Sequence, residues 1–203
     1  MVRKSFIKLL TVSSLVLLLG ACSIFPKAPQ MTVYPLPQRD VQRHSTVAVD
    51  KVLSVATPYA ISYLDTNRIV VMTPQHSLAV MEGIRWDDLG PIVFRDSLIS
   101  SLRRANIYSA VINDGTGVGD YSLRSDLQDF QMDYSVQPAE AVISIDATLI
   151  SLKARSQAYK TASFTARAAL SAESDEAVVN AFADANQQLQ QQLIQWLSTQ
   201  PLP

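Results

Sequence analysis

The only cysteine of this 203-residue chain is Cys22, and it directly follows the apolar part of an export signal. A basic start over residues 1 to 8 and an apolar run over residues 9 to 19 have the order of a secretory signal peptide. The run is too short to span a membrane, because a transmembrane helix needs about 20 apolar residues. A chain with one cysteine cannot form an internal disulfide, so its stability must come from a hydrophobic core.

Four residues at the end of this signal resemble a bacterial lipobox: Leu19, Gly20, Ala21 and Cys22. In such a motif the cysteine is acylated and the peptide is cleaved before it. The resemblance therefore implies a cleaved signal peptide over residues 1–21 and a covalent acyl lipid on Cys22. Each buried methylene contributes about 0.8 kcal/mol, so two or more acyl chains hold a protein stably on a bilayer. The alternative is an ordinary secretory signal that contains a chance cysteine.

By analogy with lipoprotein sorting, Ser23 after the cysteine favours the outer membrane, with the domain facing the periplasm. Residues 22–44 are expected to form a lipidated tether that contains four prolines, which fix the backbone in extended geometry. Tyr34 and Leu36 are its bulky apolar residues and are candidates to dock on the domain. One domain is expected over residues 45–203.

The charge of the mature chain argues against a nucleic-acid partner. Without residues 1–21 the chain has 14 basic and 18 acidic side chains, a formal net charge of −4. Phosphate-backbone binding requires a stripe of Lys and Arg, and the sequence has none.

Period-two alternation and β-branched runs predict a sheet. The first strand is expected over residues 46–55, ended by Pro58, and it places four apolar residues on one face: Val47, Val49, Leu53 and Val55. Further strands are expected over residues 68–72, 77–81, 107–112, 121–135, 143–149 and 162–170. The last three alternate as antiparallel strands with one wet face do. A phase change between Leu127 and Phe130 predicts a β-bulge.

Two segments have helical spacing. The first lies between Trp86 and Asn106, with Asp87 or Asp88 as its cap and Pro91 in its first turn. The second begins near Ser174, and its apolar stripe is expected to pack on the sheet. Its other side is expected to carry five glutamines, at positions 187, 188, 190, 191 and 195. A coiled-coil or partner-binding helix is the alternative for this second segment.

Several segments, in their order along the chain, resemble the ABC-type transport auxiliary lipoprotein family, in particular its PqiC/YmbA-like branch. They are the lipobox, Tyr34-Pro35-Leu36, residues 63–70, the tryptophan-led start of a helix at residues 85–91, and a closing helix with a late tryptophan. Residues 63–70 are similar to the family's Leu-Asp-Arg-x-x-Ile-Val segment, with Thr66 in place of the usual arginine. Five residues of these motifs are expected to be structural: Leu64, Asp65, Arg68, Trp86 and Trp196.

The resemblance implies a three-layer α/β domain with a mixed β-sheet covered by helices, similar to the anticodon-binding-like fold of the TolB N-terminal domain. It implies an outer-membrane lipoprotein that serves an MCE/ABC-type intermembrane lipid transport system without catalysis. The implied partners are the membrane, an MCE-domain protein with its ABC permease and ATPase, and further copies of the chain as a homo-oligomer. The alternative is an outer-membrane regulator of a peptidoglycan synthase.

Catalytic and metal chemistry have little support in the sequence. His44 and His76 are the only histidines and there is no second cysteine, so no metal or thiol site is expected. No serine lies in a Gly-x-Ser-x-Gly motif, the local signature of a serine hydrolase. The glycines at 115, 117 and 119 have the wrong spacing for a dinucleotide-binding loop and predict a flexible hairpin loop. We therefore expect no enzyme, no catalytic residue and no cofactor besides the acyl lipid.

Overall fold

The computed structural model describes residues 30–45, 47–152 and 159–200. The chain divides into two compact units, Met1–Gln30 and Met31–Pro203, and the second contains all of the described secondary structure. No helix among the described residues is long and apolar enough to cross a membrane. The lipobox and Cys22 lie outside the described residues, so signal cleavage and acylation stay predictions.

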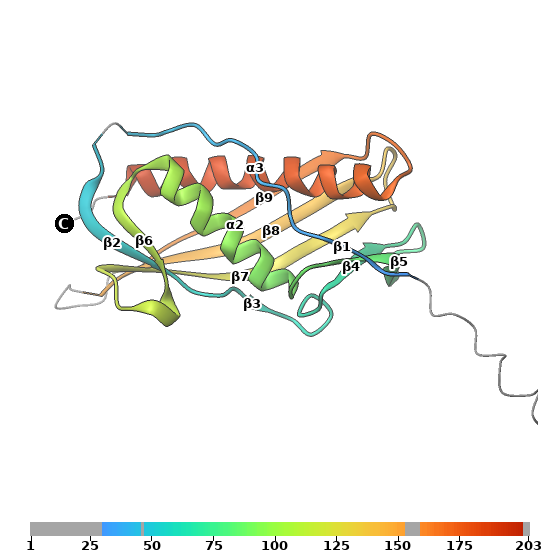
Figure 1. The fold of residues 1–203 in the computed structure, drawn as a ribbon, viewed down its shortest axis with the longest axis horizontal. Helices are drawn as coiled ribbons and strands as arrows, with labels where there is room; N and C mark the ends of the chain where they lie inside the picture. Colours follow the sequence, from blue (N-terminus) through green and yellow to red (C-terminus); the bar gives the residue numbers. More distant parts are fainter. Residues whose placement is uncertain (1–29, 46, 153–158, 201–203) are drawn as a thin grey trace, which may run out of the picture. The chain divides into compact units, whose positions relative to one another are not determined.

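The second unit is a mixed α/β structure (Figure 1). Its strands are β1 (Thr32–Tyr34), β2 (Val49–Val55), β3 (Tyr59–Ala60), β4 (Arg68–Met72), β5 (Leu78–Trp86), β6 (Tyr108–Asn113), β7 (Tyr121–Asp133), β8 (Glu140–Ser151) and β9 (Tyr159–Ala169). Its helices are α2 (Gly90–Ala105), α3 (Asp175–Thr199) and a short 3-10 turn, η2 (Asp114–Thr116).

The long strand β7 organises the sheet. Along one edge it pairs in parallel with β2 near Tyr121, with β3 near Asp126 and with β4 near Gln131. Along its other edge it pairs antiparallel with β8, and β8 pairs antiparallel with β9. The register shifts between Leu127 and Asp129, which confirms the β-bulge predicted there. One strand therefore aligns three short strands that follow one another in the sequence.

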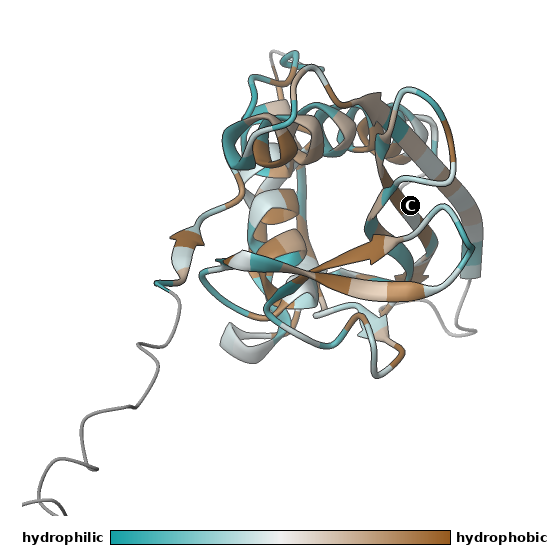
Figure 2. Ribbon diagram, turned by 90° about the vertical axis from the view of Figure 1, so that its right-hand side faces the viewer, coloured by the Kyte–Doolittle hydropathy of each residue, from teal (hydrophilic) through white to brown (hydrophobic). Residues whose placement is uncertain are grey.

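Both long helices cover the same face of the sheet, where they pack against each other (Figures 1 and 2). The expected mixed sheet covered by helices is confirmed. The described residues make one helical layer and one sheet layer, not the three layers expected, because the outward face of β8 and β9 is polar and carries no helix. Asp146, Ser163 and Thr165 are exposed on that face, as the predicted wet face requires.

The core between the layers contains the fully buried Phe94, Phe130 and Phe182 together with Trp86. The first predicted strand contributes only part of its expected face to this core. Leu53 and Val55 are buried, whereas Val47 and Val49 are exposed, because the pairing of β2 with β6 shifts register between Val49 and Val52.

The segment expected as a hairpin loop connects two strands that do not pair with each other. β6 and β7 lie on opposite sides of β2 and run parallel to it, so the loop crosses the β2 backbone. Asp120 makes this crossing tight: its N–H donates to the Val52 carbonyl, and its Oδ2 accepts from the Val52 N–H, both at 2.8 Å. A Cβ on Gly119 would lie 2.7 Å from the same carbonyl oxygen, so the crossing requires glycine there.

The two long helices begin differently. Ser174 caps α3 as predicted, with its side-chain oxygen accepting from the Ala177 N–H. The prediction that Asp87 or Asp88 caps α2 is wrong, because the N-cap is Leu89, which makes no side-chain hydrogen bond. Pro91 in the first turn is confirmed.

Candidate functional site

The first feature of the candidate site is a strap, which we define as residues 31–45, the N-terminal segment of the folded unit. β1 pairs in parallel with β5, and Leu36 is only 6% exposed within the core. The second compact unit begins at Met31, so residues 31–44 of the expected tether lie within that unit. Docking of Tyr34 and Leu36 on the domain follows from the same contacts.

Polar contacts fasten the strap to both helices. Arg39 donates from Nε to Asp184 Oδ1 at 2.9 Å and from Nη2 to Asn180 Oδ1 at 3.0 Å, both on α3. Gln187 of α3 donates to the Asp40 carbonyl. Arg104 of α2 donates to the Arg39 carbonyl at 3.3 Å. These contacts join three segments that are distant in the sequence.

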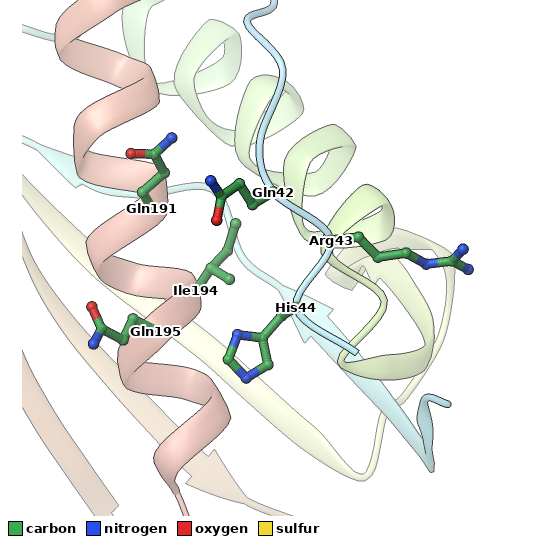
Figure 3. A pocket seen from close by; sticks show the side chains of 6 residues that line it. All are labelled: Gln42, Arg43, His44, Gln191, Ile194 and Gln195. Carbon is green, nitrogen blue, oxygen red and sulfur yellow. The ribbon is translucent and has the colours of Figure 1, made fainter. Parts of the chain in front are cut away.

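A hollow of about 510 Å³ lies between the end of the strap and α3 (Figure 3). Its lining consists of Gln42, Arg43, His44, Gln191, Ile194 and Gln195. In Figure 3 His44 points toward the Gln195 side of the hollow, while the Arg43 side chain extends away from it. Amides and one imidazole can hydrogen-bond a polar group, but no carboxylate or hydroxyl beside His44 completes a nucleophile–base pair among these lining residues.

A second hollow, of about 430 Å³, lies where the strap meets the start of α2. Pro35 and Leu36 line it from the strap, and three carboxylates line it from the other side: Asp87, Asp88 and Asp96. The described residues contain no cluster of histidine, cysteine and carboxylate groups able to hold a metal ion.

Two of the expected motif residues are central to the core. Trp86 is 1% exposed and lies against Phe130 and Phe182, with ring centroids 5.5 and 5.1 Å away. Its indole N–H is buried without a hydrogen-bond partner. Leu64 is also buried, and its carbonyl oxygen lies 3.3 Å from where a Cβ on Gly90 would be. The two motifs thus meet at the start of α2.

The other motif residues have separate surroundings. Arg68 donates from Nη2 to the Met81 carbonyl at 3.1 Å and so ties β4 to β5. Asp65 is exposed. Trp196, near the end of α3, lies edge-on against Phe164 of β9, with centroids 5.8 Å apart. The five residues therefore form no single site, since most of them hold elements together.

A buried polar network between α2 and α3 is a feature that the sequence reasoning missed. Gln190 is 2% exposed, although it was expected on the polar side of the helix. It accepts from Ser101 Oγ at 2.6 Å and donates to Ser97 Oγ at 2.9 Å, and Asn186 donates to the same Ser97 oxygen at 2.7 Å. Asn186 and Gln190 lie four and eight residues after the buried Phe182, so they share its face of the helix. This spacing predicts that both side chains are buried.

Asp129 and Tyr108 are among the ionisable groups of the sheet that have shifted pKa values. Burial raises the pKa of the Asp129 carboxyl, and nearby Asp133 raises it further, while Arg167 acts in the opposite direction. Burial also raises the pKa of Tyr108, with Tyr121 adding to the shift. Neither group lies among the lining residues of the hollows beside the strap.

Comparison with known proteins was made for both the sequence and the fold. The family model described as "ABC-type transport auxiliary lipoprotein component" matches residues 34–194. The crystal structure of protein XCC0632 from Xanthomonas campestris, of the DUF330 family, is 26% identical, with a TM-score of 0.71, covering 82% of this chain and 94% of that one. A search of curated proteins finds no match.

Two further crystal structures share the fold alone. One, of an uncharacterized protein, is 17% identical, with a TM-score of 0.64, covering 83% of this chain and 99% of that one. The hypothetical protein CT253 from Chlamydia trachomatis is 9% identical, with a TM-score of 0.51, covering 74% of this chain and 96% of that one. The likeness to the TolB N-terminal domain stays a prediction.

Proposed function

Because the chain belongs to the ABC-type transport auxiliary lipoprotein family, we propose that it is an outer-membrane lipoprotein that serves an MCE/ABC-type intermembrane lipid transport system without catalysis. Its acyl lipid is carried on Cys22, and its folded unit faces the periplasm. There it docks or organises the MCE-domain protein, which works with an ABC permease and ATPase. The observation that carries this proposal is the family match, which extends from the strap to α3.

The position of the strap supports an accessory that works close to its membrane. The leash, which we define as residues 22–30, covers the nine positions between the lipid on Cys22 and the folded unit that begins at Met31. Nine residue steps span at most about 32 Å when fully extended. A leash of residues 22–44 would have reached about 80 Å. A domain held this closely can receive a partner that approaches the bilayer, and it cannot travel far from it.

The site chemistry supports a non-catalytic role. The first hollow is lined by amides, Arg43, His44 and Ile194, with no hydroxyl or thiol among these lining residues. The second is lined by carboxylates, an amide, two serines and apolar residues, with no histidine among them. The strap is held by the buried side chain of Leu36, by the pairing of β1 with β5 and by hydrogen bonds from Arg39, Arg104 and Gln187, which suit a rigid platform. Further copies of the chain complete the platform as a homo-oligomer.

The experiment that tests this proposal is in-cell crosslinking of the tagged full-length lipoprotein, followed by affinity purification and mass spectrometry of proteins and lipids. We expect recovery of an MCE-domain protein with its permease, together with phospholipid. A Cys22→Ala variant is the matched control, and it should lose these partners along with its membrane attachment. Recovery of a peptidoglycan synthase in place of the transport proteins would overturn the proposal and favour the regulator.

A further inference from the structure

The tip of the hairpin formed by β4 and β5, residues 69–81, is free of Asp, Glu, Lys and Arg. From Ile69 to Met81 the sequence contains no Asp, Glu, Lys or Arg, whereas Arg68 and Glu82 flank it directly. Its cross-strand pairs are apolar: Val70 with Val80, Val71 with Ala79, and Met72 with Leu78. Cross-strand pairs of this kind stabilise a hairpin.

This hairpin exposes apolar side chains to the surroundings of the domain. Leu78 and Val80 are each 46% exposed, and Ala79 between them is exposed as well. An open hollow of about 370 Å³, lined chiefly by Tyr63, Val70, Leu78 and Val80, lies on the same face. A contiguous exposed apolar surface on a folded domain marks a place of interaction.

The turn of the hairpin pairs its own polar groups. The Thr73 N–H donates to the Ser77 carbonyl, and the His76 N–H donates to the Thr73 carbonyl, both at 2.9 Å. The Thr73 and Ser77 hydroxyls lie 2.7 Å apart, and Thr73 Oγ1 also accepts from the Ser77 N–H. Pro74 has no N–H to satisfy. Internal pairing lowers the cost of moving a turn out of water, since unpaired polar groups are expensive in an apolar medium.

The direction of β1 places this hairpin on the membrane side of the domain. β1 runs parallel to β5, with Thr32 opposite Ile84, so the chain enters β1 from the Leu78 end of β5. From Ile84 to Leu78 is about 20 Å along a strand, whereas the leash from Cys22 to Met31 reaches at most about 32 Å. When β5 stands perpendicular to the bilayer, the stretch from Ile84 to Leu78 takes up most of the height above the membrane that the leash can reach.

We propose that the exposed tip of the β4–β5 hairpin, with Leu78 and Val80, inserts into the headgroup region of the bilayer that holds the lipid on Cys22. This inference rests on the lipid anchor of the proposed function. The anchor supplies attachment, and the hairpin supplies orientation, because a second contact stops the domain from rotating about its leash. Apolar side chains at such interfaces lie about 5–10 Å into the boundary between headgroups and acyl chains.

The test uses the full-length lipidated chain with a single fluorophore. Acylation consumes the thiol of Cys22, the only cysteine, so Val80→Cys creates the one reactive thiol. The matched control is Val118→Cys, an exposed valine just before Tyr121, at the start of β7. The hairpin pairs with the other end of β7, through Met72 and Asp133. Val80 is level with Gln131, its neighbour through Val70, so about 33 Å of β7 separates it from the Tyr121 end.

Both variants are labelled with a nitrobenzoxadiazole dye and reconstituted in vesicles of phosphatidylethanolamine with a minor share of phosphatidylglycerol. The vesicles are made with and without a phospholipid that carries a nitroxide near the top of its acyl chain. We expect the label at position 80 to shift its emission to the blue and to lose most of it to the nitroxide, and the label at position 118 to do neither. Circular dichroism of each variant confirms that it is folded.

Each other outcome overturns the inference, and each is distinguishable. A chain that floats with the vesicles but is not quenched at position 80 keeps its anchor and refutes hairpin insertion. Equal quenching at both positions means that the domain lies on the bilayer without this orientation. A blue shift without quenching by the nitroxide means that protein, from a second copy, covers the hairpin. A chain that does not float refutes the anchor, and with it the proposed function and this inference.

Discussion

Arg39 of the strap donates from Nε to Asp184 of α3 at 2.9 Å, across 145 positions of sequence. The pair is partly exposed, so it contributes at most about 1 kcal/mol. Its importance is geometric, because it fixes the chain segment that follows the membrane leash onto the last helix of the domain. The energy of that attachment comes from the buried side chain of Leu36.

Leu36→Ala should lower the free energy of unfolding by about 2–5 kcal/mol, because it removes a core side chain and leaves a cavity. The matched control is Leu89→Ala, since Leu89 is 38% exposed, and its effect should be well below that of Leu36→Ala. Urea titration followed by circular dichroism measures both. If the two variants were equally stable, residues 31–44 would act as a free tether.

Trp86→Ala should destabilise the domain by about 3–5 kcal/mol, because the buried indole packs against both Phe130 and Phe182, which also contact each other. Trp86→Phe should be milder, since it keeps an aromatic ring and removes a buried N–H that has no partner. Trp196 is only partly buried, so Trp196→Ala should cost less than Trp86→Ala. Thermal melts of the three variants give the order, and a larger loss at Trp196 would contradict it.

Gln190→Ala should destabilise the contact between α2 and α3, because Ser101 and Ser97 would each lose one hydrogen-bond partner in the core. A buried polar group left unpaired costs about 1–3 kcal/mol. The control is Gln191→Ala, at a neighbouring position that is exposed, and it should leave stability almost unchanged. Chemical denaturation of both variants decides whether the network holds the helices together.

Asp129→Asn should stabilise the domain at neutral pH. The folded-state pKa of Asp129 is raised above the usual aspartate value of 3.8, chiefly by burial. The folded state therefore favours the protonated form, and its contribution to stability is fully present below pH 3.8 and is lost as the pH rises through the raised pKa. The variant does not lose stability in this way. The difference in free energy of unfolding between the variant and the unaltered protein should therefore vanish as the pH falls toward 3.8. Unfolding curves at several pH values test this, and a constant difference would refute it.

Cys22→Ala should release the protein from the membrane and leave the fold intact, because the core lies entirely in the unit that begins at Met31. Membranes washed with carbonate, followed by immunoblotting, show where the chain is. A variant that still sediments with the washed membranes would show that another part of the chain holds it there.

The chain by itself determined its strands and helices where local patterns are strong. The alternation in β8 and β9, the bulge in β7 and the Ser174 cap are local properties of backbone and side chain, so a sequence window contains them. The strands expected over residues 121–135 and 143–149 had the alternation of antiparallel strands, and the structure pairs β7 with β8 in that way. The Leu64 and Trp86 motifs were recognised by their order along the chain, and the structure supplied the reason for them, which is burial around the start of α2.

Tertiary structure alone decided which segments meet. The strap lies on α2 and α3, Gln190 turns inward to meet two serines, and β2, β3 and β4 align in series along β7. Pro35 and Pro37 made residues 22–44 resemble a free tether, because extended backbone has the same local sequence whether it is solvated or packed. Contacts between residues that are distant in the sequence depend on the burial of many side chains from several elements at once. No short window of the sequence contains all of those residues.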